Sequence, residues 1–225
     1  MSGSHDGHRA RMKNRFLMHG LDNFDDHAVL ELLLFHSVPR RDTNELAHEL
    51  INRFGSLAEV FDAPVDALTK LDGLGEASAL LIRLMPQLAR RYLISRTAPD
   101  KQLFSSRQAG EYITPYFFGE RDEVVYLICL DGKQKVIACR LMFRGSVNSA
   151  AINMRRLVET ALTFNSTSVI LAHNHTSGIP TPSPEDISST RRIADALAAV
   201  DIALTDHIVV ADSDFVSLAD NGLFG

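Results

Sequence analysis

Histidine and carboxylate side chains gather in one short stretch of the chain, residues 172–186, which reads AHNHTSGIPTPSPED. His173 and His175 are two residues apart, and Asp186 follows where a helical pattern begins. Imidazole nitrogens and carboxylate oxygens are the ligands of catalytic zinc, which takes three protein ligands and keeps a fourth position for water. The stretch therefore predicts a Zn²⁺ site with His173, His175 and Asp186 as ligands.

The residues around these three explain how they would converge. The short apolar run before His173, residues 168–171, predicts a strand. If the chain stays extended to His175, the two imidazoles project on the same side, about 6.5–7 Å apart along the backbone. Pro184 suits the first position of a helix, with Ser183 as its N-cap. Asp186 then lies on the first helical turn, from which its carboxylate can turn back to the metal.

The same residues also have an ordinary structural interpretation. Ser183 would simply cap a helix whose first turn carries acidic residues, as the helix dipole favours. His173 and His175 would be two solvated loop histidines. The two interpretations are compatible, because a capping serine can also line a site, and the four positions taken together favour zinc.

The spacing of these residues resembles a known pattern. His-x-His, seven residues, Ser, two residues and Asp is similar to the JAMM (MPN+) metalloprotease motif. The surrounding sequence resembles that of the RadC family, bacterial proteins that carry a JAMM domain. The matching segments are residues 143–146 (FRGS), 170–175 (ILAHNH), 177–178 (SG), 205–210 (TDHIVV) and 215–218 (FVSL).

Two positions depart from that family. Thr176 stands where the family usually has proline, and residues 153–156 read NMRR where it usually reads HPRE. The ligand positions are unchanged, so the resemblance still implies zinc. The departures affect what it implies about the substrate.

The resemblance also implies a general base, a glutamate that enters the first strand of the JAMM domain. Glu123, before Val125 and Leu127, fits that position best, and Glu120 is the weaker alternative. Without the resemblance, Glu123 would be an ordinary exposed residue at a strand end. Ser183 is expected to donate a hydrogen bond to the developing oxyanion. The predicted catalytic residues are thus Glu123 and Ser183.

The order of the expected elements predicts an α/β domain preceded by a small all-α domain. Residues 26–98 show helical periodicity, and Pro99 lies in a linker, residues 96–100. After it, strands at 123–130, 135–143, 168–171, 203–211 and 215–218 alternate with helices at 105–118, 153–164 and from Pro184. A hairpin at Asp131-Gly132 makes the sheet mixed. The JAMM resemblance implies MPN-like, cytidine-deaminase-like layering. The predicted domains are residues 1–98 and 103–225.

The helical domain contains residues 71–79, LDGLGEASA, which resemble the hairpin of helix-hairpin-helix proteins. Such a hairpin can hold a DNA phosphate with its amides and the next helix N-terminus. Glu76 has the wrong charge for that role, and such hairpins also occur purely as packing devices. A DNA contact through this domain is therefore an alternative, while the wider segment resembles the helical N-terminal domain usual in RadC proteins.

Composition excludes several classes of protein. The net charge of −5 argues against a broadly basic nucleic-acid-binding surface. Cys129 and Cys139 lie in apolar runs and are expected to be reduced thiols. The sequence shows no signal peptide and no membrane span, so a cytoplasmic location is expected.

The sequence thus predicts a zinc-dependent amide hydrolase, and the resemblance implies a metallopeptidase-like enzyme that acts on a peptide or isopeptide bond of an unknown protein or peptide. The alternatives are a DNA-associated repair protein or metal-dependent nuclease, and a scaffold with structural zinc.

Overall fold

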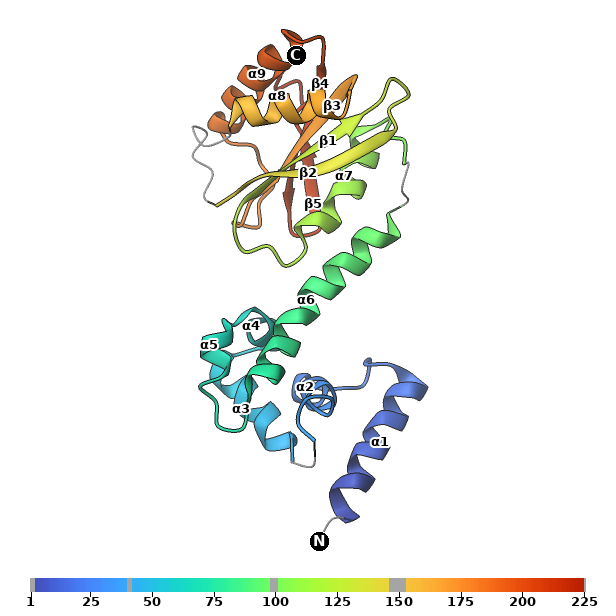
Figure 1. Ribbon diagram of the computed structural model, residues 1–225, viewed down its shortest axis with the longest axis vertical. Coiled ribbons are helices and arrows are strands. Elements are labelled where there is room, and N and C mark those ends of the chain that lie inside the picture. The colour runs from blue at the N-terminus through green and yellow to red at the C-terminus, as the bar shows by residue number, and fades with distance from the viewer. Residues whose placement is uncertain (1–2, 40–41, 98–100, 146–152, 225) are drawn as a thin grey trace. The chain divides into compact units, whose positions relative to one another are not determined.

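The chain forms two compact units, Met1–Ala89 and Arg90–Gly225, each with its own hydrophobic core. The computed structural model describes residues 3–39, 42–97, 101–145 and 153–224 (Figure 1). The predicted domain boundary at Pro99 lies outside the described residues. A helical region followed by a mixed sheet with helices, as predicted, is confirmed.

The first unit consists of helices. They are α1 (Gly3–His19), α2 (Asp26–Leu34), α3 (Asn44–Phe54), α4 (Leu57–Asp62), α5 (Val65–Leu68) and the first part of α6 (Glu76–Arg96). Leu30, Leu50, Leu68 and Ile82 are fully buried at its centre. The hairpin predicted before α6 belongs to the same core, because Leu71 and Leu74 are buried in it.

The second unit is built on a five-stranded sheet with strand order β2-β1-β3-β4-β5. Its strands are β1 (Val124–Leu130), β2 (Val136–Arg144), β3 (Ser168–Asn174), β4 (Ala203–Ala211) and β5 (Asp214–Ser217). Its helices are α7 (Ser106–Ile113), the 3₁₀ helix η1 (Thr114–Phe117), α8 (Met154–Thr163) and α9 (Pro184–Ala198). Only β3 and β4 are parallel, while the β1–β2, β1–β3 and β4–β5 pairs are antiparallel.

Helices cover both faces of this sheet (Figure 1). On one face, the α9 face, side chains such as Leu127 and Leu171 pack with Leu157 of α8 and Ile193 of α9. On the other, the α7 face, Ile128, Ile170 and Ile208 pack with Ile113. Every residue of β1 and β3 is buried, which explains why these strands read as continuous apolar runs rather than alternating ones.

The site described next lies where β3 ends, β1 begins and α9 begins. Because β1 and β3 are antiparallel, the start of one strand lies beside the end of the other, with Val125 paired to His173. Among the described residues, no helix is both long and apolar enough to cross a membrane.

Candidate metal centre

His173 lies near the end of β3, the central strand of the sheet. It pairs with Val125 of β1 on one side and Val209 of β4 on the other. Only 3% of its side chain is exposed. A histidine in this position is held by two neighbouring strands, so its imidazole has little freedom to move.

His175 follows β3 and continues its extended path, because its backbone N–H donates to the Val210 carbonyl at 2.8 Å. Its Nδ1 lies 3.0 Å from the Ile179 carbonyl oxygen. A carbonyl can only accept a hydrogen bond, so Nδ1 carries the hydrogen. In the neutral imidazole, Nε2 then has the lone pair that a metal requires.

Asp186 lies on the first turn of α9, as predicted, in a reciprocal capping box with Ser183. Its Oδ2 accepts from the Ser183 backbone N–H at 2.7 Å and from the Ser183 hydroxyl at 2.6 Å. Burial by itself would raise the pKa of the Asp186 carboxyl. The neighbouring His173 and the two Ser183 hydrogen bonds outweigh burial and hold this pKa well below its usual range, so the carboxylate is ionised.

The three predicted ligands converge. One ligand atom from each of His173, His175 and Asp186 lies within 4.8 Å of the others. Each histidine Nε2 is 3.3 Å from an Asp186 oxygen. Ligands of a tetrahedral zinc at 2.0–2.1 Å would themselves be about 3.3–3.4 Å apart, so the two histidine–carboxylate separations suit zinc.

A polar atom without a partner also points to a missing ligand. The Nε2 of His173 is buried, and no group among the described residues hydrogen-bonds to it. Buried polar atoms without partners are rare in folded proteins, and leaving this nitrogen unsatisfied would carry an energetic cost. A metal ion bound by the three residues would satisfy it. The arrangement can therefore hold a metal ion.

Glu123 lines the same pocket as the three side chains. The pocket has a volume of about 290 Å³ and is lined by Glu123, His173, His175, Ser177, Ser183, Glu185 and Asp186. Glu123 immediately precedes β1, where the predicted base was expected.

Asn174 fixes the backbone on both sides of Glu123, a role for which the sequence pattern gives no signal. Its Oδ1 accepts from the Val124 N–H at 2.7 Å, and its Nδ2 donates to the Asp122 carbonyl at 3.1 Å. The residue between the two histidines therefore connects the end of β3 to the start of β1. Only a side chain that both accepts and donates can make this pair of bonds.

Glu120, the weaker alternative for the base, has a different environment. Its carboxylate is 5% exposed and is bonded to Arg90 and to Arg144, including an Arg144 Nη2 bond of 2.9 Å. Arg90 also donates to the Tyr126 hydroxyl at 3.3 Å. Glu120 does not line the metal-site pocket, and its carboxylate forms ion pairs with two guanidinium groups.

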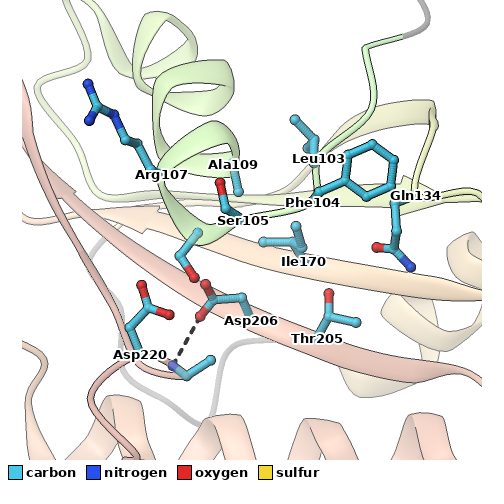
Figure 2. A pocket seen from close by; sticks show the side chains of 12 residues that line it. Leu103, Phe104, Ser105, Arg107, Ala109, Gln134, Ile170, Thr205, Asp206 and Asp220 are labelled. Carbon is cyan, nitrogen blue, oxygen red and sulfur yellow. Dashed lines mark hydrogen bonds between the residues drawn. The ribbon is translucent and has the colours of Figure 1, made fainter.

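The residues Asp206 and His207, which are adjacent on β4, point to opposite faces of the sheet. His207 is buried beside His173, with 2.8 Å between His207 Nε2 and His173 Nδ1. Asp206 lies under α7 in a separate pocket of about 580 Å³ (Figure 2). The larger pocket is thus not the one in which the predicted site residues gather.

Three protein groups among the described residues donate hydrogen bonds to the Asp206 carboxylate. Its oxygens accept from the Ser217 hydroxyl and from the backbone N–H groups of His207 and Ala219, the last shown dashed in Figure 2. Burial raises the pKa of Asp206, and these hydrogen bonds offset only part of that effect.

Comparison with known proteins places the chain in a family. A family model described as the RadC-like JAB domain matches residues 103–223. A UPF0758 protein of Pseudomonas savastanoi pv. phaseolicola is 33% identical over 213 residues, covering 95% of each chain. A UPF0758 protein of Pseudomonas syringae pv. tomato is 34% identical over the same length and coverage. These names state no activity. The chain therefore belongs to the RadC family, and its RadC-like JAB domain contains the three converging side chains.

Proposed function

We propose that the second unit is a zinc-dependent hydrolase that cleaves an amide bond, in a peptide or an isopeptide linkage. The observation that supports this most directly is the convergence of His173, His175 and Asp186 in a pocket that Glu123 also lines. Membership of a JAB-domain family supports the same general chemistry, that of a metallohydrolase.

The roles of the residues follow from their positions. When bound, zinc would acidify water and polarise the amide carbonyl. Glu123 takes the proton from the attacking water and returns it to the leaving nitrogen. Asn174 holds the backbone of Glu123 beside the pocket, so that the base is in position before the substrate arrives.

Ser183 is the proposed donor to the oxyanion. In the structure its hydroxyl hydrogen is directed to Asp186 Oδ2. A hydroxyl has a single hydrogen, so donation to a substrate oxygen requires this bond to be exchanged. The backbone N–H of Ser183, which also donates to Asp186 Oδ2, would keep the carboxylate in place during the exchange.

Metal analysis combined with a substrate screen tests the proposal. Protein purified without added metal should contain about one zinc per chain, as expected for one three-ligand site. Peptides and isopeptide-linked conjugates should be tested beside single- and double-stranded DNA on the same preparation. We expect amide hydrolysis that a chelator abolishes and zinc restores. Protein without zinc, or hydrolysis that survives complete metal removal, would exclude this mechanism.

A DNA contact through the first unit is a second candidate. It is supported by an open hollow of about 550 Å³ along residues 69–75, in which a Cβ added to Gly75 would meet nothing within 4 Å. A phosphate could approach the backbone there, but Glu76 on the first turn of α6 opposes it. If the hairpin binds phosphate, Glu76→Lys should strengthen binding of labelled duplex DNA in fluorescence anisotropy, more at low salt than at high salt. An unchanged affinity would remove this candidate.

A further inference from the structure

A chain of hydrogen bonds connects two of the candidate metal ligands, His173 and Asp186. His173 Nδ1 is 2.8 Å from His207 Nε2, and His207 Nδ1 is 2.5 Å from Thr190 Oγ1. The Thr190 hydroxyl is in turn 2.6 Å from the backbone carbonyl oxygen of Asp186. The chain thus begins at one candidate ligand and ends at the backbone of another, and its members His173, His207 and Thr190 are all buried.

Such a chain can run in two directions, and the carbonyl at its end favours one of them. The Asp186 carbonyl can only accept, so the Thr190 hydroxyl that bonds to it must donate its single hydrogen there. Thr190 then accepts from His207 Nδ1–H. The neutral His207 is left with an acceptor at Nε2, which requires His173 to carry its hydrogen on Nδ1.

The opposite direction conflicts with the surroundings of His173. If Thr190 donated to His207, then His207 would donate to His173, and His173 would carry its hydrogen on Nε2. That atom is buried, and although Asp186 Oδ1 lies 3.3 Å away, the two do not form a hydrogen bond. A hydrogen on Nε2 would therefore be a buried donor without an aligned acceptor, which is unfavourable. A lone pair at that position is instead available to a metal.

We infer that His207 is a positioning residue that holds His173 as the Nδ1–H tautomer, with Thr190 holding His207 in turn, so that the lone pair of His173 Nε2 faces the metal position before any metal binds. The inference rests on the proposed metal site for its function. Its geometry depends only on this chain's own residues.

Imidazole nitrogen NMR tests the tautomers directly. On the metal-free protein at about pH 8, above the ordinary histidine pKa, the ring nitrogens of His173 and His207 should show hydrogen on Nδ1 and none on Nε2. Zinc addition should shift His173 Nε2 and leave both tautomers unchanged. A metal-free protein in which His207 carries its hydrogen on Nε2 would overturn the inference.

Four variants test the consequence for metal affinity, measured by competition with a chelating dye. His207→Leu removes the acceptor and should weaken zinc binding about 10–100-fold, the usual effect of losing a partner of a metal-binding histidine. His207→Gln keeps an acceptor near the position of Nε2 and should recover most of that loss. The zinc affinity of Thr190→Val should fall between those of His207→Leu and His207→Gln. Asp206→Asn, equally buried on the opposite face, should leave zinc affinity unchanged.

The outcomes separate this inference from the proposed function. Zinc affinity of His207→Leu within about twofold of the wild type would contradict the inference, since the expected loss is at least tenfold. If His207→Leu does not fold, the tautomers of the metal-free wild-type protein decide, and hydrogen on His207 Nε2 would contradict the inference. Wild-type protein that binds no zinc, but shows both expected tautomers, would contradict the proposed function alone. Zinc binding with reversed tautomers in the metal-free protein would contradict the inference alone.

Discussion

Two buried aspartates, Asp186 and Asp206, mark opposite faces of the same sheet. Their exposed fractions are similar, 7% and 4%. Asp206 accepts from a hydroxyl and two backbone N–H groups. Asp186 has one oxygen occupied by Ser183, while the other lies 3.3 Å from a histidine nitrogen that makes no hydrogen bond among the described residues. Burial is therefore common to both faces, and unused bonding capacity distinguishes the α9 face.

The two glutamates before β1 also differ in their surroundings. Glu120 is bonded to two arginines and, through Arg90, is linked to Tyr126, whose ring belongs to the core of the α7 face. Glu123 lines the pocket of the three converging side chains. Asp206 and Glu120 are thus bonded to neighbouring protein groups, whereas Asp186 and Glu123 line one pocket.

The most decisive test of this difference removes a metal ligand on the α9 face and, separately, a carboxylate on the α7 face. We expect His175→Ala to lose almost all bound zinc, because two remaining ligands hold the metal poorly. Asp206→Asn should keep about one zinc per chain. Elemental analysis of both purified proteins measures the difference. Full zinc occupancy in His175→Ala would show that the ligand assignment is wrong.

The next largest effect concerns the two glutamates. Glu123→Gln has almost the same shape but cannot accept a proton, so hydrolysis should fall about 10²-fold or more while zinc stays bound. Glu120→Gln should keep most of the activity per folded molecule. Initial rates and zinc content are measured on the same samples. If Glu120→Gln is the inactive variant, the base has been assigned three residues too late.

The stability of the two glutamate variants should show the reverse order, with the larger loss in Glu120→Gln. Glu120→Gln leaves Arg90 and Arg144 without their carboxylate, and a hydrogen bond to a charged group contributes about 1.5–3 kcal/mol. We therefore expect a clear loss in the free energy of unfolding, measured in urea. Glu123→Gln changes a side chain that lines the pocket, so we expect it to lose less. Equal losses in both variants would remove the distinction between the faces.

The smallest expected effect is a pH dependence on the α7 face. Since burial raises the folded-state pKa of Asp206, the folded protein holds this proton more tightly than the unfolded chain does. Asp206 therefore contributes stability below its unfolded pKa of about 3.9 and loses it as pH rises through the folded value. Asp206→Asn has no carboxyl to titrate. Its unfolding free energy should therefore rise relative to that of the wild type as pH increases from the unfolded pKa of Asp206 to the folded one. A difference between the two proteins that does not change with pH would show that the pKa of Asp206 is not raised by folding.

The sequence predicted those parts of the site that depend on local chemistry. Ser183 and Pro184 define the start of α9 by their own preferences, so Asp186 was placed on the first turn from spacing alone. The apolar run before His173 likewise predicted β3, because a strand covered on both faces needs no polar residues. The α/β fold followed from the order of such elements.

Contacts between distant residues could not be predicted in the same way. His207 lies 34 residues from His173, and their contact depends on the parallel register of β3 and β4. Asn174 meets the Val124 amide 50 residues away. The arginines that occupy Glu120 are 30 and 24 residues away from it. Without a register, the sequence left the choice between Glu120 and Glu123 to resemblance.

The amide of Asn174 has a consequence for how a substrate would enter. It ties the proposed base and the ligand strand together across neighbouring strands, which lie about 4.7–4.9 Å apart in a sheet. Base and ligands are then assembled in advance, and we expect no closing lid to be needed. We expect the adjustment to fall to the substrate instead, whose scissile segment would have to enter a pocket of about 290 Å³.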